Sequence, residues 1–267
     1  MIAFLSDFGH ADPYVGIVKG VIHSIVNDTH VIDLTHEIEP GNIFQASFVL
    51  GISYKYFPKG TIFLCVVDPG VGSNRRGIVG AGGGYFFVGP DNGIFSHVSN
   101  ELDLKFFEIK NKNLFLPEVS VTFHGRDVFG PVAAHLEKGV PLEDIGPGVE
   151  DITILNIPKP IKRGDSIQGE ILYFDRFGNA ITNIPLDLFD GSGKQDVKSL
   201  CVSVKGHKFP VVDCYESGKG KGVFGILGSH GFLELSVYLG SVRSKLEINR
   251  GDKVEVKSVE CFRSVEF

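Results

Sequence analysis

The sequence has no tryptophan, one methionine and only four cysteines among its 267 residues. The cysteines are scattered without a CxxC pair, so their spacing does not indicate a zinc site, and we expect no metal. No apolar run approaches the roughly 20 residues that span a bilayer. The opening residues MIAFLSDFGHAD lack the basic start of a signal peptide. The net charge of −6, without a basic stripe, makes nucleic acid a poor partner. We therefore expect a cytoplasmic protein that binds neither membrane nor nucleic acid.

The most informative stretch is the continuous apolar run Ile62–Val67, which leads directly into Asp68 and the turn PGVGSNRR. A run of this length predicts a strand buried on both faces, as in a parallel sheet covered by helices. Asp68 would then follow the carboxyl end of a central strand, where open α/β sheets bind ligands. The proline and glycines turn the chain back, so Arg75 can return towards Asp68. This pair is either part of a site or an ion pair that fixes the turn.

Strands and helices alternate over the first half of the chain. Apolar spacing predicts strands at Ile2–Leu5, Val31–Leu34 and Ile62–Val67, with helices after Pro13 and over Ile43–Tyr54. This order is typical of a doubly wound α/β domain. The later segments Gly77–Gly80, Tyr85–Val88 and Phe106–Ile109 predict further strands, and the turn Gly89–Gly93 could expose Asp91 and Asn92.

Several polar side chains fall at the same predicted sheet edge. Asp7, His10 and Asp12 follow the first strand, and Asp12 before Pro13 is also a helix N-cap signal. His124 precedes the helical pattern that ends near Leu136. It is either a solvated residue or a base at a strand–helix junction.

The pattern changes after Pro147, where three prolines and a charged run suggest a linker. Beyond it, short segments alternate with period two between Gly/Ser/Asp turns, which predicts a small β-barrel or sandwich. We assign residues 1–157 to an N-terminal, Rossmann-like α/β domain with a mostly parallel sheet. Residues 158–166 are the expected linker, and residues 167–267 a C-terminal all-β, barrel-like domain.

Six segments in one order carry a resemblance: SDFGHAD, DPGVGSNRR, GPDNG, TFHGRD, FDRFGNAITNI and GSHGFLELS. Together they resemble the S-adenosyl-L-methionine hydroxide adenosyltransferases, relatives of the adenosyl-fluoride and adenosyl-chloride synthases. The resemblance implies an N-terminal α/β domain and a C-terminal barrel. It also implies a homotrimer whose active sites lie at subunit interfaces, with S-adenosyl-L-methionine as substrate rather than cofactor.

The resemblance also implies roles for individual residues. Asp68, Arg75 and His124 are the expected catalytic triad beside the water or hydroxide, with the general base unassigned. Asp7 is expected on the ribose hydroxyls. The other expected substrate contacts are Asp12, Asp175 and Ser229 at the methionine portion, Phe177 beside the ligand, Asn179 at the adenine edge, and Phe123, Tyr238 and Leu239. His230 stands where halide-using relatives have an arginine for the methionine carboxylate.

The activity that follows is hydrolysis of S-adenosyl-L-methionine to adenosine and L-methionine by in-line attack of water on the ribose 5′ carbon. Histidine, with an ordinary pKa near 6.5, suits proton transfer at neutral pH. Halide synthesis is an alternative, although halide enzymes have a tyrosine at Asp68, and those that use fluoride have a serine at Gly125 and a tryptophan at Gly41. A non-catalytic binder of S-adenosyl-L-methionine or adenosine, and a metal-dependent phosphoesterase that uses Asp7, His10, Asp12, Asp68 and His124, are the others.

Overall fold

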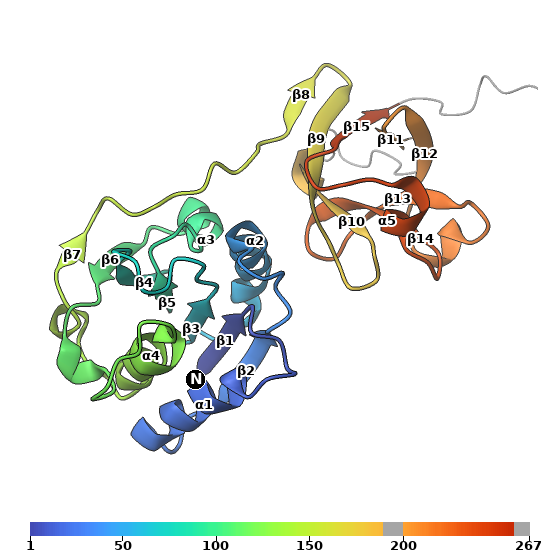
Figure 1. Ribbon diagram of the computed structural model, residues 1–267. Helices are drawn as coiled ribbons and strands as arrows, with labels where there is room; N and C mark the ends of the chain where they lie inside the picture. Colours follow the sequence, from blue (N-terminus) through green and yellow to red (C-terminus); the bar gives the residue numbers. More distant parts are fainter. Residues whose placement is uncertain (189–199, 259–267) are drawn as a thin grey trace, which may run out of the picture. The chain divides into compact units, whose positions relative to one another are not determined.

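The computed structural model describes residues 1–188 and 200–258, and its internal contacts divide the chain into two units, Met1–Ile157 and Pro158–Phe267 (Figure 1). Each unit has its own hydrophobic core. Among the residues described, no helix combines the length and hydropathy that a bilayer span requires.

The N-terminal unit is built on one seven-stranded sheet in the order β2-β1-β3-β5-β4-β6-β7. The pairs β1–β2, β1–β3 and β3–β5 are parallel, and the pairs β4–β5, β4–β6 and β6–β7 are antiparallel. Only β4 and β7 therefore run against the other strands, which confirms the mostly parallel α/β prediction. The strands are β1 (Ile2–Ser6), β2 (Val31–Thr35), β3 (Ile62–Val66), β4 (Gly77–Gly82), β5 (Tyr85–Pro90), β6 (Lys105–Glu108) and β7 (Gly148–Val149).

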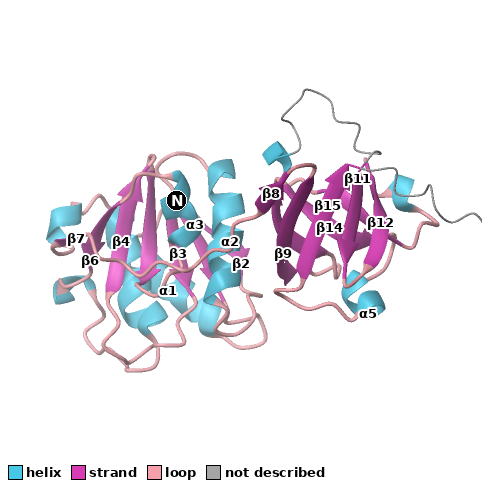
Figure 2. Cartoon of the chain, turned by 90° about the horizontal axis from the view of Figure 1, so that it is seen from above, coloured by secondary structure: helices cyan, strands magenta, loops and turns pink. Residues whose placement is uncertain are grey.

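Helices cover both faces of this sheet, so the unit has three layers (Figures 1 and 2). One core joins α1 and α4 to the sheet, and the other joins α2 and α3 to its opposite face. The four helices are α1 (Tyr14–Ile25), α2 (Ile43–Ser53), α3 (Ser96–Glu101) and α4 (Gly130–Glu137), the last preceded by a π-helical turn, Gly125–Phe129.

The apolar run that predicted β3 is buried on both sides. Ile62, Leu64 and Val66 pack against the α1–α4 face, whereas Phe63 and Cys65 pack against the α2–α3 face. All five side chains are at most 2% exposed. Burial of each large side chain contributes about 1.5–3 kcal/mol, so this central strand anchors the loop that follows it.

The C-terminal unit contains a closed β-barrel, as predicted. Its strands follow the order β10-β14-β13-β12-β11-β15-β9, and pairing of β9 with β10 closes the ring, while β8 extends the sheet beside β9. The strands are β8 (Ile161–Arg163), β9 (Ser166–Phe174), β10 (Ala180–Pro185), β11 (Leu200–Val204), β12 (His207–Val212), β13 (Val223–Leu227), β14 (Phe232–Val237) and β15 (Lys253–Ser258), with a short helix α5 (Val242–Leu246) after β14.

Two local predictions were wrong. Asp12 does not cap α1, because the cap position is taken by Pro13 and no side chain bonds there; Asp12 is exposed. The Gly89–Gly93 turn does not expose its polar pair, since Asp91 is 8% exposed and Asn92 is partly buried. In addition, residues 161–163 of the expected linker form β8 and pair with β9.

Candidate active site

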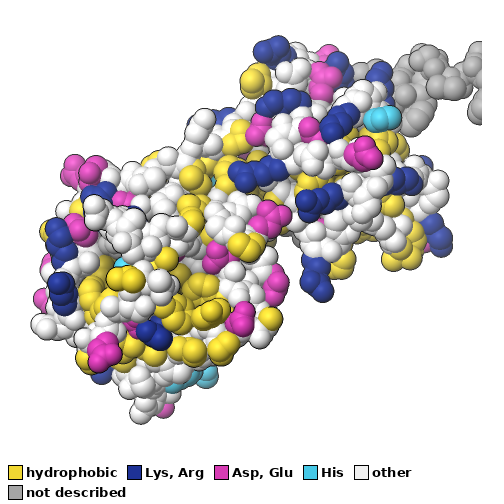
Figure 3. Space-filling model, in the orientation of Figure 1, with side chains coloured by type: hydrophobic (Ala, Val, Ile, Leu, Met, Phe, Trp, Pro, Cys, Tyr) yellow, Lys and Arg dark blue, Asp and Glu magenta, His cyan; other side chains and the backbone are white. Residues whose placement is uncertain are grey.

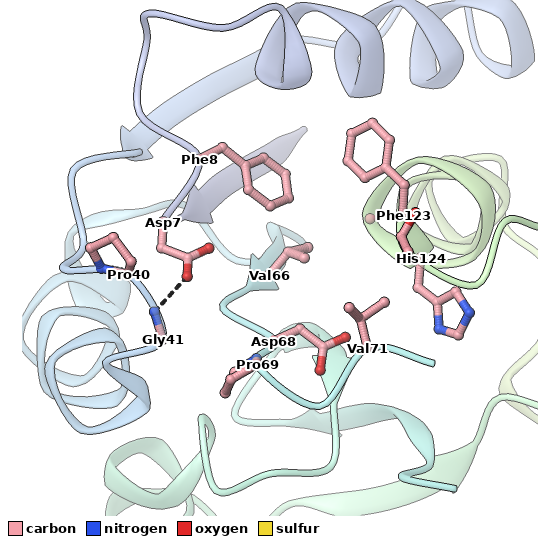
Figure 4. Close-up of a pocket in the computed structure, with 12 residues that line it drawn as sticks. Asp7, Phe8, Pro40, Gly41, Val66, Asp68, Pro69, Val71, Phe123 and His124 are labelled. Atoms are coloured by element: carbon pink, nitrogen blue, oxygen red, sulfur yellow. Dashed lines mark hydrogen bonds between the residues drawn. The ribbon is translucent and has the colours of Figure 1, made fainter. Parts of the chain in front are cut away.

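The candidate site lies where the strand order of the N-terminal sheet reverses. From β1 the chain passes first to β2 on one side and then to β3 on the other, so the carboxyl ends of β1 and β3 are neighbours. Crevices at such switch points bind ligands in α/β folds. Here a pocket of about 340 Å³ opens between the loops after β1 and β3 and the segment before α4. Its lining includes Asp7, Phe8, Asp68, Phe123 and His124 (Figure 4).

Arg75 joins the two polar groups on one side of this pocket. Its Nε donates to both oxygens of Asp68, at 2.8 and 3.0 Å, and its Nη2 also bonds Oδ2. The same Nη2 lies 2.8 Å from Nδ1 of His124. The guanidinium packs 5.1 Å from the Phe129 ring and is 12% exposed, while Asp68 is 6% exposed. The three side chains that the sequence singled out as a triad are thus in direct contact.

The contact with Arg75 fixes the protonation of His124. Because a guanidinium only donates hydrogen bonds, Nδ1 of His124 must accept, and the ring proton is then on Nε2. Burial, together with the positive charge of Arg75, holds the pKa of His124 below its usual value. His124 is therefore a neutral imidazole whose Nε2–H is a donor.

Local backbone geometry places His124 beside the loop after β3. His124 immediately precedes the π-helical turn Gly125–Phe129, a feature often found at functional sites. Gly72, in the β3–β4 loop, has φ +79°, and a Cβ there would lie 2.6 Å from the carbonyl oxygen of Val121. Only glycine allows this close approach of the two segments.

Phe8 and Phe123 form an aromatic part of the pocket lining, and Tyr14, which does not line the pocket, packs against both rings. The ring of Phe123 lies 5.7 Å from Phe8 and 5.4 Å from Tyr14, in edge-to-face arrangements. Sequence reasoning missed Phe8 and Tyr14, although Phe8 lies inside the SDFGHAD segment and an aromatic residue in a polar loop was an available signal.

The three polar residues after β1 have different positions. Asp7 lines the pocket, and its Oδ2 accepts a hydrogen bond of 2.8 Å from the Gly41 amide. Asp12 and His10 are not among the lining residues, and the His10 ring packs 5.1 Å from that of His36. Of this group, the structure brings only Asp7 together with Asp68 and His124.

The predicted residues of the second half gather around a separate pocket in the barrel unit. Phe177, Asn179, Tyr238 and Leu239 line a cavity of about 610 Å³, together with Tyr215, which the sequence did not single out. Asp175 is not a lining residue; its carboxylate accepts hydrogen bonds from the backbone and side-chain amides of Asn179, at 2.8 and 2.9 Å. Asp175 thereby fixes the orientation of Asn179.

Ser229 and His230 lie in the turn between β13 and β14, where Ser229 is exposed. The Nδ1 of His230 accepts from the Phe232 amide at 3.3 Å, and its Nε2 lies 3.0 Å from Oε2 of the buried Glu234. A carboxylate contact by His230 would have to replace one of these bonds. Tyr215 also donates to Glu234, which links this turn to the barrel pocket.

No three His, Cys, Asp or Glu side chains of residues 1–188 and 200–258 are grouped so that they could hold a metal ion. Asp7, Asp68 and His124 line the same pocket, but Asp68 and His124 are bonded to Arg75. The guanidinium of Arg75 therefore occupies the position between the Asp68 carboxylate and the His124 imidazole that a metal ion bound to both would take.

Comparisons with known proteins match both units. Residues 2–146 match the domain family "SAM hydroxide adenosyltransferase N-terminal domain", and residues 169–255 match "SAM hydroxide adenosyltransferase C-terminal domain". The chain is 37% identical to an "(R)-S-adenosyl-L-methionine hydrolase" of Thermus thermophilus, over 96% of this chain and 98% of that protein. A "Fluorinase" of Actinopolyspora mzabensis is 25% identical over 96% of both chains.

A solved structure has the same fold. The crystal structure of an uncharacterized conserved protein from Thermotoga maritima superposes with a TM-score of 0.91 at 39% identity, covering 96% of this chain and all of that one. With both domain descriptions matched in order, this chain belongs to the SAM hydroxide adenosyltransferase family.

Proposed function

We propose that this protein hydrolyses S-adenosyl-L-methionine to adenosine and L-methionine, with water or hydroxide as the nucleophile at the ribose 5′ carbon. The observation that carries the proposal is the contact of Asp68, Arg75 and His124 at one wall of the switch-point pocket. Membership of the family and the name of the Thermus relative, an (R)-S-adenosyl-L-methionine hydrolase, support the choice of substrate. Because that name specifies the R sulfonium, we propose the same epimer for this chain.

The reaction suits a partly apolar pocket from which the bound substrate displaces water. As the oxygen–carbon bond forms, the C5′–S bond breaks, and its electron pair goes to sulfur, which becomes the neutral thioether of methionine. Charge therefore decreases between hydroxide and sulfonium in the transition state, so loss of water from the site favours the step. Holding the nucleophile in line replaces much of the entropy cost of the encounter.

The triad orients the nucleophile from two sides. In our proposal, Nε2–H of His124 donates a hydrogen bond to the oxygen of the water. The carboxylate of Asp68 accepts a hydrogen bond from the same water and takes that proton as the water attacks. The three hydrogen bonds from Arg75 leave about one of the four lone-pair sites of the Asp68 carboxylate, on Oδ1, for a further donor. Arg75 holds both partners and adds a positive charge that favours the developing hydroxide.

Substrate contacts follow from the resemblance. We propose Asp7 for the ribose hydroxyls, with Asp12, Asp175 and Ser229 at the methionine portion. Phe177, Phe123, Tyr238 and Leu239 would enclose the ligand, and Asn179 would meet the adenine edge. Asp175 would in addition orient Asn179, because its carboxylate accepts hydrogen bonds from both amides of that residue.

We also propose a cytoplasmic homotrimer in which the α/β unit of one subunit and the barrel unit of its neighbour share each active site. Large apolar side chains at the pockets support this assembly: Phe177 is 78% and Leu239 92% exposed, and Val121, beside the β3–β4 loop, is 71% exposed. Hydrophobic side chains also gather on the visible face of the α/β unit (Figure 3). Large apolar side chains that are exposed in this way are expected where another subunit covers them.

The test is incubation of the purified protein with each sulfonium epimer of S-adenosyl-L-methionine in ¹⁸O-labelled water, followed by mass spectrometry. We expect labelled adenosine and free methionine from the R epimer. Intact ligand would contradict the proposal and favour a binder. Formation of 5′-chloro-5′-deoxyadenosine in added chloride would favour halide transfer, and loss of activity in excess chelator would favour a metal-dependent enzyme.

A further inference from the structure

The turn Gly89–Gly93 contains two buried or partly buried polar side chains, Asp91 and Asn92, to which the mechanism above assigns no role. Neither lines the switch-point pocket or the barrel pocket. Their neighbours are nevertheless the residues that flank the triad in sequence.

The sheet topology explains why this turn meets the catalytic loop. Strand β5 lies between β3 and β4, parallel to the first and antiparallel to the second. The loop that leaves β3 and enters β4 must therefore cross the carboxyl end of β5. The turn that continues from that end of β5 then lies between the start and the finish of the loop.

Each end of the loop is bonded to one of the two side chains. At the start, Nδ2 of Asn92 donates to the carbonyl oxygen of Val67, the residue before Asp68, at 2.9 Å. At the finish, Oδ2 of Asp91 accepts from Nε and Nη2 of Arg76, the residue after Arg75, at 3.0 and 2.7 Å. The Asp91 amide also donates to the Arg76 carbonyl at 2.9 Å.

We infer that Asp91 and Asn92 are positioning residues that hold the two ends of the loop and thereby keep Asp68 and Arg75 in register with His124. The catalytic consequence of this inference rests on the proposed function. Shifts of about 1 Å in a catalytic group can cost about a hundredfold in rate, so the loop between the two attachments needs such support.

The chain offers a matched control for Asn92. Asn92 accepts from the amide two residues on, Ile94, at 3.2 Å while its Nδ2 donates to a distant carbonyl. Asn111 does the same: it accepts from the Asn113 amide at 3.1 Å, and its Nδ2 donates to the Asp144 carbonyl at 2.7 Å. Among the hydrogen bonds of the described residues, none joins Asn111 to the β3–β4 loop. Asn92→Ala and Asn111→Ala therefore remove the same two bonds at different places.

The experiment compares these variants in the full-length protein. For Asn92→Ala we expect kcat for hydrolysis of S-adenosyl-L-methionine to fall about tenfold or more with KM within about twofold, because misplacement affects the reacting groups more than binding. For Asn111→Ala both constants should stay within about twofold. Equal losses in the two variants, or an unchanged kcat in Asn92→Ala, would overturn the inference.

A second readout does not depend on activity. In Asn92→Ala, loosening of Arg75 should move the pKa of His124, followed by NMR of its ring, upwards towards the ordinary histidine value; in Asn111→Ala it should not move. If the pKa of His124 does not move in Asn92→Ala, the positioning role of Asn92 is contradicted, even if the wild type fails to hydrolyse the substrate. If Asn92→Ala does not fold, Asp91→Asn should give the same two changes, because an amide nitrogen at the position of Oδ2 cannot accept the two hydrogen bonds from Arg76.

Discussion

At the scale of single residues, the hydrogen bond from Arg75 decides what His124 can do. An imidazole whose Nδ1 accepts from a guanidinium at 2.8 Å, and whose pKa is lowered, is a donor through Nε2 rather than a ready base. The sequence allowed either role, because it does not show which ring nitrogen is occupied.

The donor role predicts a difference between two substitutions. His124→Gln keeps an amide N–H near the position of Nε2, whereas His124→Ala removes it. We expect kcat to fall about 10²-fold or more in the alanine variant but only about tenfold in the glutamine variant, because a hydrogen bond to the nucleophile is retained. Steady-state kinetics with S-adenosyl-L-methionine measures both.

Equal and severe losses in the two variants would instead make His124 the proton acceptor, since glutamine cannot take a proton. The structural control is the melting temperature of each variant, which should remain close to that of the wild type because His124 is at the pocket wall rather than in a core.

At the scale of elements, a partly buried histidine contributes to the contact between α2 and α3. The Nδ1 of His97 lies 2.9 Å from Oγ of Ser47, and the His97 ring packs edge-to-face on Phe44 and Phe48. Burial lowers the pKa of His97 to about 4. The folded state therefore holds this side chain neutral over a pH range in which the unfolded chain binds a proton.

This contact predicts an acid-sensitive stability. Between pH 6.5 and about 4 the unfolded state binds more protons than the folded state, so the free energy of unfolding decreases as the pH falls. From pH 7 to pH 4.5 His97 should account for a loss of roughly 2 to 3 kcal/mol. Urea unfolding at both pH values, followed by circular dichroism because the chain lacks tryptophan, measures the loss.

His97→Gln should reduce the pH-dependent part of this loss, although the variant starts from a lower stability at pH 7. The control is His207→Gln on the exposed surface of β12, which should leave the pH dependence unchanged. An identical pH dependence in wild type and His97→Gln would show that other groups cause the loss.

Helices and strands could be predicted where their burial requires a recognisable pattern of apolar residues in the sequence. The two-faced core position of β3 gives an uninterrupted apolar run, and the run predicted the strand and the place of Asp68. β10 has no such run, because buried polar residues interrupt it. Thr182 donates to the Leu233 carbonyl at 2.7 Å, and Asn183 bonds the Pro158 carbonyl and the Glu170 amide at 2.8 and 2.7 Å. Those partners are distant in sequence, so no local pattern reveals that the polar groups are satisfied inside the barrel.

The same limit applied to the candidate site. The contact of Asp68 with Arg75 was predictable, because a short turn joins them, and the position of His124 followed from its place before a helix. The roles of Asp91 and Asn92 were not predictable, because they depend on β5 lying between β3 and β4. A strand order of this kind is set by tertiary packing.

At the scale of the whole molecule, the two units contribute different chemistry. The α/β unit holds the charged triad, and the barrel unit holds a largely aromatic and aliphatic pocket lined by Phe177, Tyr215 and Leu239. The switch-point pocket has the groups proposed to orient the nucleophile, whereas Asn179, the side chain proposed for the adenine edge, lies in the barrel pocket. The proposed function therefore requires both units, and the proposed trimer supplies them from neighbouring subunits.

This assembly predicts complementation between two inactive variants. Asp68→Ala disables the α/β half of a site, and Phe177→Asp disables the barrel half at an exposed side chain that the fold does not need. If each site takes its two units from different subunits, some sites of random mixed trimers are intact. Such a site combines the unchanged α/β unit of a Phe177→Asp subunit with the unchanged barrel unit of an Asp68→Ala subunit. About one quarter of the wild-type activity should then return when the two are co-expressed in equal amounts. If both halves come from one subunit, the co-expressed protein should be as inactive as its parents. Trimers of each variant alone, checked by light scattering, show that loss of activity is not loss of assembly.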